Sequence, residues 1–178
     1  MVYPAPAVLV SCGSTREEAN MFTVAWTGTI CTNPAMLSIS VRPERYSYGI
    51  IKREMQFSVN LTTVAMARAT DWCGVRSGRD YDKWKETGLT PEPGVNNSCF
   101  HIKESPLVIE CRVKDIIALG SHDMFIAEVL GVLADDRYID AETGAFDLAA
   151  AGLMAYSHGA YYALGEKLGK FGFSVKKG

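Results

Sequence analysis

Residues 107–133 read LVIECRVKDIIALGSHDMFIAEVLGVL, and this stretch decides the fold. It contains two long runs of β-forming residues, Leu107 to Ile117 and Met124 to Leu133, separated by six residues. A parallel crossover needs about a dozen residues or more, whereas antiparallel strands need only a short turn. The two runs are therefore predicted to pair as a long antiparallel hairpin.

Shorter β-type runs lie on both sides of this hairpin. They cover Ala7 to Cys12, Phe22 to Trp26, Met36 to Arg42, Phe57 to Leu61 and Leu153 to Ser157. Helical spacing predicts a short helix over Tyr46 to Arg53 and a second one that begins after Thr63 and ends near Gly74. With six or seven strands, mostly antiparallel, a barrel is expected because it closes its own edges.

The composition indicates one globular domain over residues 1–178, since a chain of this length is within the usual size of a domain. Its 18 basic and 20 acidic residues give a net charge of −2, which provides no overall field for nucleic acid or an anionic membrane. No apolar run approaches the ~20 residues that cross a bilayer. We expect a cytoplasmic protein with no nucleic-acid or membrane partner, in which any anion site is local.

The sequence lacks the usual dinucleotide, P-loop, zinc-protease and hydrolase signatures. Its five cysteines are widely and irregularly spaced, and its three histidines have no second ligand at helical or turn spacing. Reduced, mostly buried thiols and no metal site built by the protein are therefore expected.

Five blocks of sequence stand out instead. NMFTVAWTG at Asn20 to Gly28 is followed, with Pro34 in between, by S-x-x-x-x-R-Y-S at Ser40 to Ser47, by F-x-V-N-L at Phe57 to Leu61, and later by SGRDYDKW and GSHDMFIAEV. Their order and intervals resemble the flavin reductase-like family, over roughly Val8 to Gly172 and closest to its flavoredoxin branch. The resemblance implies a mainly β, antiparallel FMN-binding split barrel of Greek-key type with a few short helices.

The resemblance also implies FMN as cofactor, with its phosphate, ribityl chain and flat ring each needing a different kind of group. Ser47, at the start of the predicted helix, matches the family's phosphate cradle together with Lys83 and either Arg42 or Arg45. Trp26 is the implied flat partner of the ring. The whole implied cofactor-binding set is Asn20, Thr23, Val24, Ala25, Trp26, Thr27, Gly28, Ser40, Arg42, Arg45, Tyr46, Ser47, Asn60, Leu61, Ser77, Gly78, Lys83, His122 and Tyr156.

Several of these positions also have a simpler interpretation. Lys83 and the nearby arginines are consistent with solvated surface charges, and Ser47 with a helix N-cap. A tryptophan in an apolar strand is typical of a core. His122 is the implied catalytic residue because the family has a histidine near the flavin at this place, but a histidine in a turn is usually solvated.

The activity implied by the resemblance is hydride transfer from NAD(P)H to FMN, followed by electron transfer to an acceptor. A second hypothesis is an FMN-containing electron carrier with little NAD(P)H turnover, and a third is a non-catalytic flavin-binding module. No second nucleotide motif is present, so NAD(P)H is expected to bind transiently at the exposed flavin face. The acceptor stays open between a protein, free flavin and a ferric chelate, and the family implies a homodimer.

Overall fold

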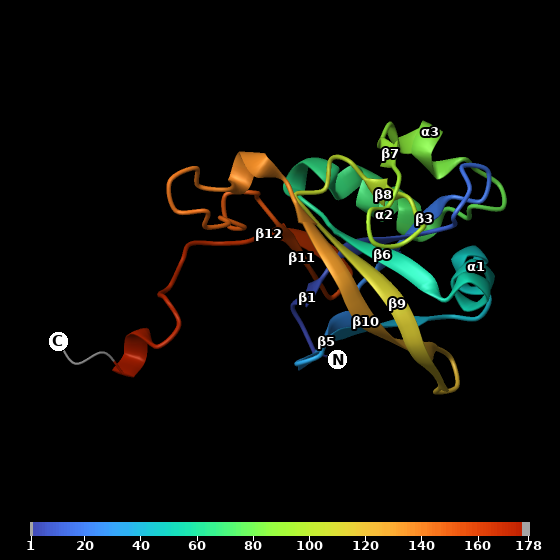
Figure 1. The fold of residues 1–178 in the computed structure, drawn as a ribbon, viewed down its shortest axis with the longest axis horizontal. Helices are drawn as coiled ribbons and strands as arrows, with labels where there is room; N and C mark the ends of the chain where they lie inside the picture. Colours follow the sequence, from blue (N-terminus) through green and yellow to red (C-terminus); the bar gives the residue numbers. More distant parts are fainter. Residues whose placement is uncertain (1, 176–178) are drawn as a thin grey trace.

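A seven-stranded antiparallel sheet forms the centre of the computed structural model, which describes residues 2–175 (Figure 1). The sheet order is β3-β2-β6-β9-β10-β5-β4, and the predicted hairpin is its longest pair, with Asp123 opposite Ala118 at the turn. The strands are β2 (Val8–Cys12), β3 (Asn20–Val24), β4 (Thr27–Thr32), β5 (Ala35–Val41), β6 (Gln56–Leu61), β9 (Leu107–Ala118) and β10 (Asp123–Ala134). The expected antiparallel split barrel with few helices is confirmed.

Smaller elements surround this sheet. A three-stranded sheet of order β1-β11-β12 is formed by β1 (Ala5–Pro6), β11 (Met154–Ser157) and β12 (Ala160–Ala163), and β7 (Pro91–Glu92) pairs with β8 (His101–Ile102). The helices are α1 (Tyr46–Glu54), α2 (Ala67–Val75) and α3 (Lys83–Thr87), with short 3₁₀ turns η1 (Val64–Met66), η2 (Asp136–Tyr138) and η3 (Phe173–Val175).

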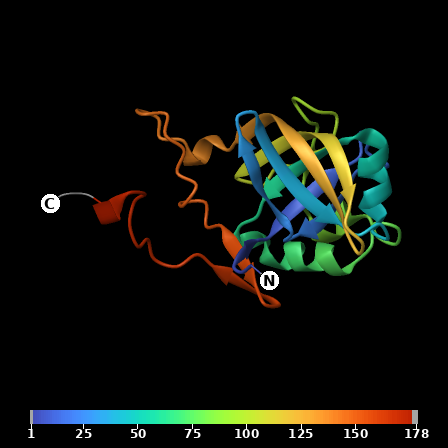
Figure 2. The same cartoon turned by 90° about the horizontal axis from the view of Figure 1, so that it is seen from below.

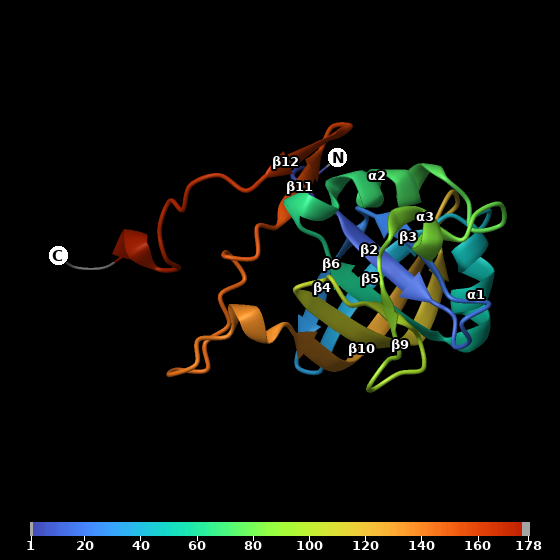
Figure 3. The ribbon, with the colours of Figure 1, turned by 90° about the horizontal axis from the view of Figure 1, so that it is seen from above.

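The curved sheet, which Figure 2 shows from below, encloses the main core. Phe57 and Phe125 are the largest of its fully buried side chains, and they lie among the apolar residues that alternate along β2, β5 and β6. A second, smaller core, which includes the buried residues Leu9, Met21 and Trp84, fixes α2 and α3 to the outside of β2 and β3. Figure 3 shows both helices over these strands. This second core sets the position of the polar loops between the helices.

Two predictions of extended structure need correction. The run from Phe22 to Trp26 is not one strand, because β3 ends at Val24 and the chain re-enters the sheet as β4 at Thr27. β4 escaped prediction because, as an edge strand, it needs no apolar alternation and most of its side chains are exposed. β12 lies beyond the last predicted strand, in a part of the chain for which no strand was predicted. That residues 1–178 form one domain stays a prediction.

Among residues 2–175, none of the helices combines the length and the apolar character that a membrane crossing requires.

Candidate functional site

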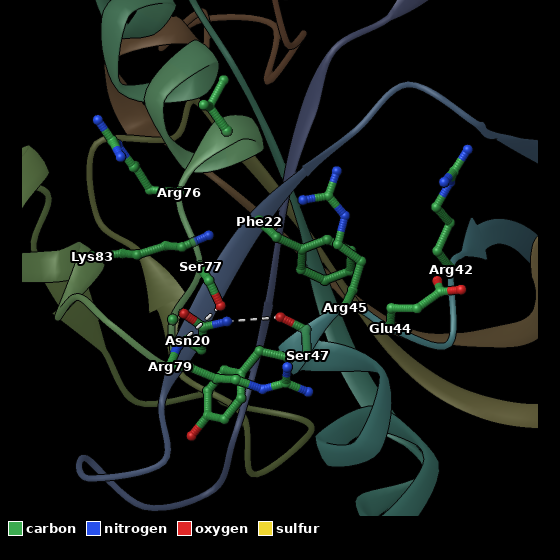
Figure 4. A pocket seen from close by; sticks show the side chains of 13 residues that line it. Asn20, Phe22, Arg42, Glu44, Arg45, Ser47, Arg76, Ser77, Arg79 and Lys83 are labelled. Carbon is green, nitrogen blue, oxygen red and sulfur yellow. Dashed lines mark hydrogen bonds between the residues drawn. The ribbon is translucent and has the colours of Figure 1, made fainter.

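One cavity of about 560 Å³ concentrates positive charge on the surface of the barrel. It lies between the start of α1, the end of α2 and the loop that leads to α3, and we call it the cationic pocket (Figure 4). Five cations and a single carboxylate, Glu44, line it. Its lining residues are Asn20, Phe22, Arg42, Glu44, Arg45, Tyr46, Ser47, Val75, Arg76, Ser77, Gly78, Arg79 and Lys83.

The start of α1 forms one wall of the cationic pocket. Arg45 occupies the N-cap position with an extended backbone, no side chain caps the helix, and its first turn carries no acidic residue. Ser47 is therefore not the N-cap but lies within the first turn. A nine-residue helix that begins in this way directs the positive end of its dipole and unsatisfied N–H groups toward the pocket.

Ser47 is fixed by a buried contact with the strand beside it. The Asn20 side chain donates from Nδ2 to Ser47 Oγ over 2.7 Å, and both residues are buried (Figure 4). Gly78 closes over this pair: a Cβ there would collide with Asn20 Oδ1 and would come within 2.8 Å of Tyr46 Cδ1. The loop can thus approach Asn20 and α1 only with glycine at this position.

Lys83 supplies a buried cation at the back of the pocket. Its side chain is almost fully buried, with 3% of the residue exposed, and Nζ donates to the Cys73 carbonyl over 2.7 Å. Burial lowers the pKa of this amine to about 8, and the nearby Arg45 guanidinium adds to the effect. The interpretation of Lys83 as a solvated surface charge is therefore wrong.

Arg45 connects the cationic pocket with two smaller ones. Its guanidinium donates to the Gly74 carbonyl over 3.1 Å. It also borders a cavity of about 110 Å³ along residues 22–26, together with Ser40 and His122, which we call the strand pocket. On its other side it borders a cavity of about 290 Å³, which we call the aromatic pocket. The three pockets therefore form one continuous surface around Arg45.

The aromatic pocket is walled by Trp26, Tyr156 and Tyr161. The rings of Tyr156 and Tyr161 pack edge to face at 5.5 Å, while Tyr3 bridges Trp26 and Tyr156 at 6.4 and 6.0 Å. Burial, with a smaller contribution from Asp71, raises the pKa of Tyr161 to about 12, so its hydroxyl keeps its proton at neutral pH. Trp26 is half-buried at the surface of the barrel and does not belong to either apolar core.

Most of the residues implied by the family line these three pockets. The structure brings together Asn20, Thr23, Val24, Ala25, Trp26, Ser40, Arg42, Arg45, Tyr46, Ser47, Ser77, Gly78, Lys83, His122 and Tyr156. His122 is half-buried, with Nδ1 3.0 Å from Ser121 Oγ. It thus reaches the pocket wall from the hairpin turn.

Four implied residues line none of the three pockets. Asn60 is fully buried, and its amide is used up inside the fold: Nδ2 donates to the Leu9 carbonyl and to Ser11 Oγ, and Oδ1 accepts from the Ile102 amide. Leu61 packs against the main core. Thr27 and Gly28 lie on the edge strand β4, where Thr27 Oγ1 donates to the Ser38 carbonyl.

Other lining residues were not in the implied set. Arg76 and Arg79 join the cationic pocket from the loop after α2, and Tyr161 and Asp71 join the aromatic pocket. Arg76 and Arg79 directly flank Ser77-Gly78 in the sequence. This local concentration of positive charge was a signal that could have identified both arginines as residues of the pocket. Nothing in the sequence links Tyr161 on β12 with Asp71 on α2, because only the fold places them together. No group of metal-ligating side chains occurs within residues 2–175.

The fold and its arrangement of pockets place the protein in the class of flavin reductase-like split barrels. Its sequence matches the family described as "Flavin reductase like domain" over residues 1–165, and the chain belongs to this family. It superposes on flavoredoxin of Desulfovibrio vulgaris (Miyazaki F) with a TM-score of 0.90 and 29% identity, covering 99% of this chain and 95% of that one.

Two further relatives support the assignment to this family. Flavoredoxin from Methanosarcina acetivorans superposes with a TM-score of 0.87 at 26% identity, covering 99% of this chain and 95% of that one. An NADPH-flavin oxidoreductase of Streptomyces viridifaciens is 27% identical over 128 residues, which cover 69% of this chain and 63% of the relative. The resemblance to the family is thereby confirmed, and these findings support a flavin-related oxidoreductase.

Proposed function

We propose that the protein binds FMN and holds the phosphate group in the cationic pocket. The observation that carries this proposal is the convergence of five cations, the Ser47 hydroxyl and the uncapped start of α1 on one cavity that contains a single carboxylate. A phosphate dianion satisfies such a donor set, and in particular it gives the buried Lys83 amine a counter-charge.

The flavin ring then belongs along the strand pocket and the aromatic pocket, which begin where Arg45 ends the cationic one. Residues 23–26 run along this wall, and Trp26 offers an apolar face. When bound, the flavin supplies hydride and single-electron chemistry that no side chain of the protein provides. The protein contributes the position of the flavin, the positive charge around its phosphate and an apolar wall beside its ring.

We propose NAD(P)H as the reductant, supported by the family and by the name of the Streptomyces relative. His122 lies at the wall of the strand pocket, half-buried and on a turn, where one ring nitrogen can face a ligand while the other faces Ser121. Its role in this proposal is to orient the flavin or the nicotinamide by a hydrogen bond. The electrons pass on to an acceptor, which is a protein, free flavin or a ferric chelate.

A titration of the apoprotein with FMN and riboflavin tests the phosphate assignment. FMN is expected to bind at least tenfold more tightly, because a charge-assisted hydrogen bond contributes roughly 1.5–3 kcal/mol. Equal affinities for the two ligands would contradict the assignment.

Stopped-flow bleaching of the FMN-loaded protein by NADH and by NADPH tests the reductase role separately. Rapid bleaching supports a reductase. Bleaching by dithionite alone would leave a flavin-binding module, and bleaching by a protein donor alone would leave an electron carrier.

A further inference from the structure

Asn20 and Cys12 lie next to each other beside the start of α1. They are directly opposite each other in the antiparallel pair of β2 and β3, so their side chains lie on the same face of the sheet. Asn20 is 5% exposed and Cys12 is fully buried. Ser47, in the first turn of α1, bonds to the Asn20 amide and also forms a hydrogen bond with the Cys12 thiol. Two side chains of the sheet therefore contact the Ser47 hydroxyl.

The Asn20 amide decides where the Ser47 proton can go. A serine hydroxyl has one proton to donate and two lone pairs that accept. Asn20 Nδ2 donates to Ser47 Oγ over 2.7 Å, so the amide occupies a lone pair and leaves the proton free (Figure 4). If the amide were turned the other way, its carbonyl oxygen would accept this proton, and Ser47 could no longer donate toward the cationic pocket.

The free proton of Ser47 has two possible acceptors. One is the sulfur of Cys12, which as a thiol is only a weak acceptor. Burial raises the pKa of this thiol, so it stays neutral and attracts the proton no more strongly. The other is an anion in the cationic pocket, which Ser47 lines. Because a phosphate oxygen is the stronger acceptor, the proton is expected to turn from the sulfur to the phosphate when the ligand binds.

The surroundings hold the Asn20 side chain in place. The carbonyl of the preceding residue, Ala19, accepts from Trp84 Nε1 over 2.9 Å, and the following residue, Met21, is fully buried in the second core. On the side of the pocket, Gly78 passes so close that a Cβ there would collide with Asn20 Oδ1. Asn20 is therefore constrained before a ligand arrives, and little ordering is left for binding to pay.

We propose that Asn20 is a positioning residue that acts through Ser47: its amide keeps the Ser47 proton available to the cationic pocket, where this proton forms a hydrogen bond with the phosphate of FMN. The Cys12 thiol accepts the proton only while the pocket is empty. This inference rests on the proposed function, since it assumes that the phosphate group lies in this pocket. It gives Asn20 a role other than the direct contact with the flavin that the family resemblance implies.

A double-mutant cycle tests whether Asn20 acts through Ser47. Flavin fluorescence gives the dissociation constants of FMN and riboflavin for the wild type, Asn20→Ala, Ser47→Ala and the double variant. Asn20→Ala is expected to weaken FMN roughly fivefold to tenfold, because the hydroxyl loses its fixed direction, and to change riboflavin less than about twofold. Once Ser47 is replaced there is no proton to direct, so adding Asn20→Ala should weaken FMN by less than about twofold.

Asn20→Asp tests the direction of the hydrogen bond. The side chain keeps its shape, but the amide donor is replaced by a carboxylate that accepts the Ser47 proton. FMN should weaken roughly tenfold more than in Asn20→Ala, because the proton is withdrawn from the pocket rather than left without a fixed direction. The same substitution in the Ser47→Ala background measures only the repulsion between the new charge and the phosphate, and this loss should be the smaller of the two.

Asn60→Ala is the matched control for a purely structural role, because Asn60 is also a buried asparagine whose side-chain amide is hydrogen-bonded within the fold. It should destabilise the protein without changing FMN affinity. Urea unfolding of each variant separates the loss of the fold from the loss of binding, and riboflavin affinity shows that the site is formed. If Asn20→Ala does not fold, the Asn20→Asp cycle, which keeps the shape of the side chain, decides.

Three results would overturn this inference and leave FMN binding itself untouched. They are equal losses of FMN and riboflavin affinity in Asn20→Ala; an undiminished effect of Asn20→Ala in the Ser47→Ala background; and a loss in Asn20→Asp no larger than the loss in Asn20→Ala. A wild type that binds FMN and riboflavin equally would contradict the phosphate assignment, and the role of Asn20 would be refuted with it.

Discussion

Two regions of the molecule use the same kinds of polar side chain for opposite purposes. Beneath the segment from Val95 to Ile102, on the face of β6 and β9 away from the main core, the Asn60 amide and the Glu110 carboxylate are fully buried. Glu110 accepts from the amides of Val95 and Asn96 and from Asn96 Nδ2, each at 2.7 Å. In the cationic pocket, Asn20 and Ser47 bond to each other, while the cations around them face a cavity. Buried polar groups with complete partners hold the fold, and those left facing a cavity are available to a ligand.

The largest effect is expected for the stability of the fold when Asn60 is replaced, because its side chain bonds within the fold and is not available to a ligand. Asn60→Ala leaves the Ile102 amide and the Leu9 carbonyl without their side-chain partner, so the free energy of unfolding should fall by about 2–4 kcal/mol. Urea titration measures this loss, with the exposed Thr29→Ala as control. FMN affinity of the folded fraction should stay within twofold. A clear loss of affinity would place Asn60 in the flavin site after all.

Lys83 and Ser47 give the next largest effect, and here it should be on binding. Lys83→Ala and Ser47→Ala are each expected to weaken FMN by about 1–3 kcal/mol, because an anionic oxygen loses a donor in a partly dry site. Riboflavin affinity should hardly change. Lys85→Ala is the matched control, because Lys85 lies on the same helix but is exposed. Calorimetric titration decides the matter, and parallel losses for both ligands would mean that the phosphate lies elsewhere.

The pH dependence of FMN binding tests whether the Lys83 amine contacts the phosphate. Its pKa of about 8 lies below the usual 10.5 because of burial, and a bound phosphate is expected to raise it again. FMN binding then takes up a proton above pH 8, so affinity should fall with rising pH, by at most about tenfold per pH unit. Riboflavin binding and the variant Lys83→Met should lack this component. A pH profile shared by wild type and variant would assign the titration to another group.

Stability of the apoprotein should respond to pH in the opposite direction. Because the folded-state pKa of Lys83 is lower than the unfolded one, the unfolded chain binds more protons between pH 8 and 10.5. The Lys83 contribution to the free energy of unfolding therefore rises with pH over this window. Buried thiols such as Cys73, whose pKa burial raises to about 11, contribute with the opposite sign. The difference between wild type and Lys83→Met isolates the lysine.

The sequence predicted the barrel better than the site, and the reason is physical. The hairpin of β9 and β10 follows from local alternation and the length of its turn, which both lie within one stretch of chain. The pockets depend on contacts between distant elements, such as Tyr161 with Asp71. Asn60 shows the limit most clearly, since a family motif marks its position but not the side of the sheet on which its amide finds partners.

The smallest effect on FMN affinity is expected when an exposed cation of the pocket is replaced. The salt dependence of this effect distinguishes the exposed cations from the buried Lys83. Arg42 is exposed and none of its side-chain contacts within residues 2–175 is a salt bridge or hydrogen bond, so water screens its interaction with a bound phosphate. Arg42→Ala should therefore weaken FMN by only about 0.2–1 kcal/mol, and this loss should shrink as salt is raised toward about 1 M. The loss from Lys83→Ala should persist at the same salt, because its buried amine is screened much less. Titrations of both variants at low and high salt measure the contrast. If both losses disappeared together in salt, the cationic pocket would act only as a diffuse field, and the buried amine would make no direct contact with the phosphate.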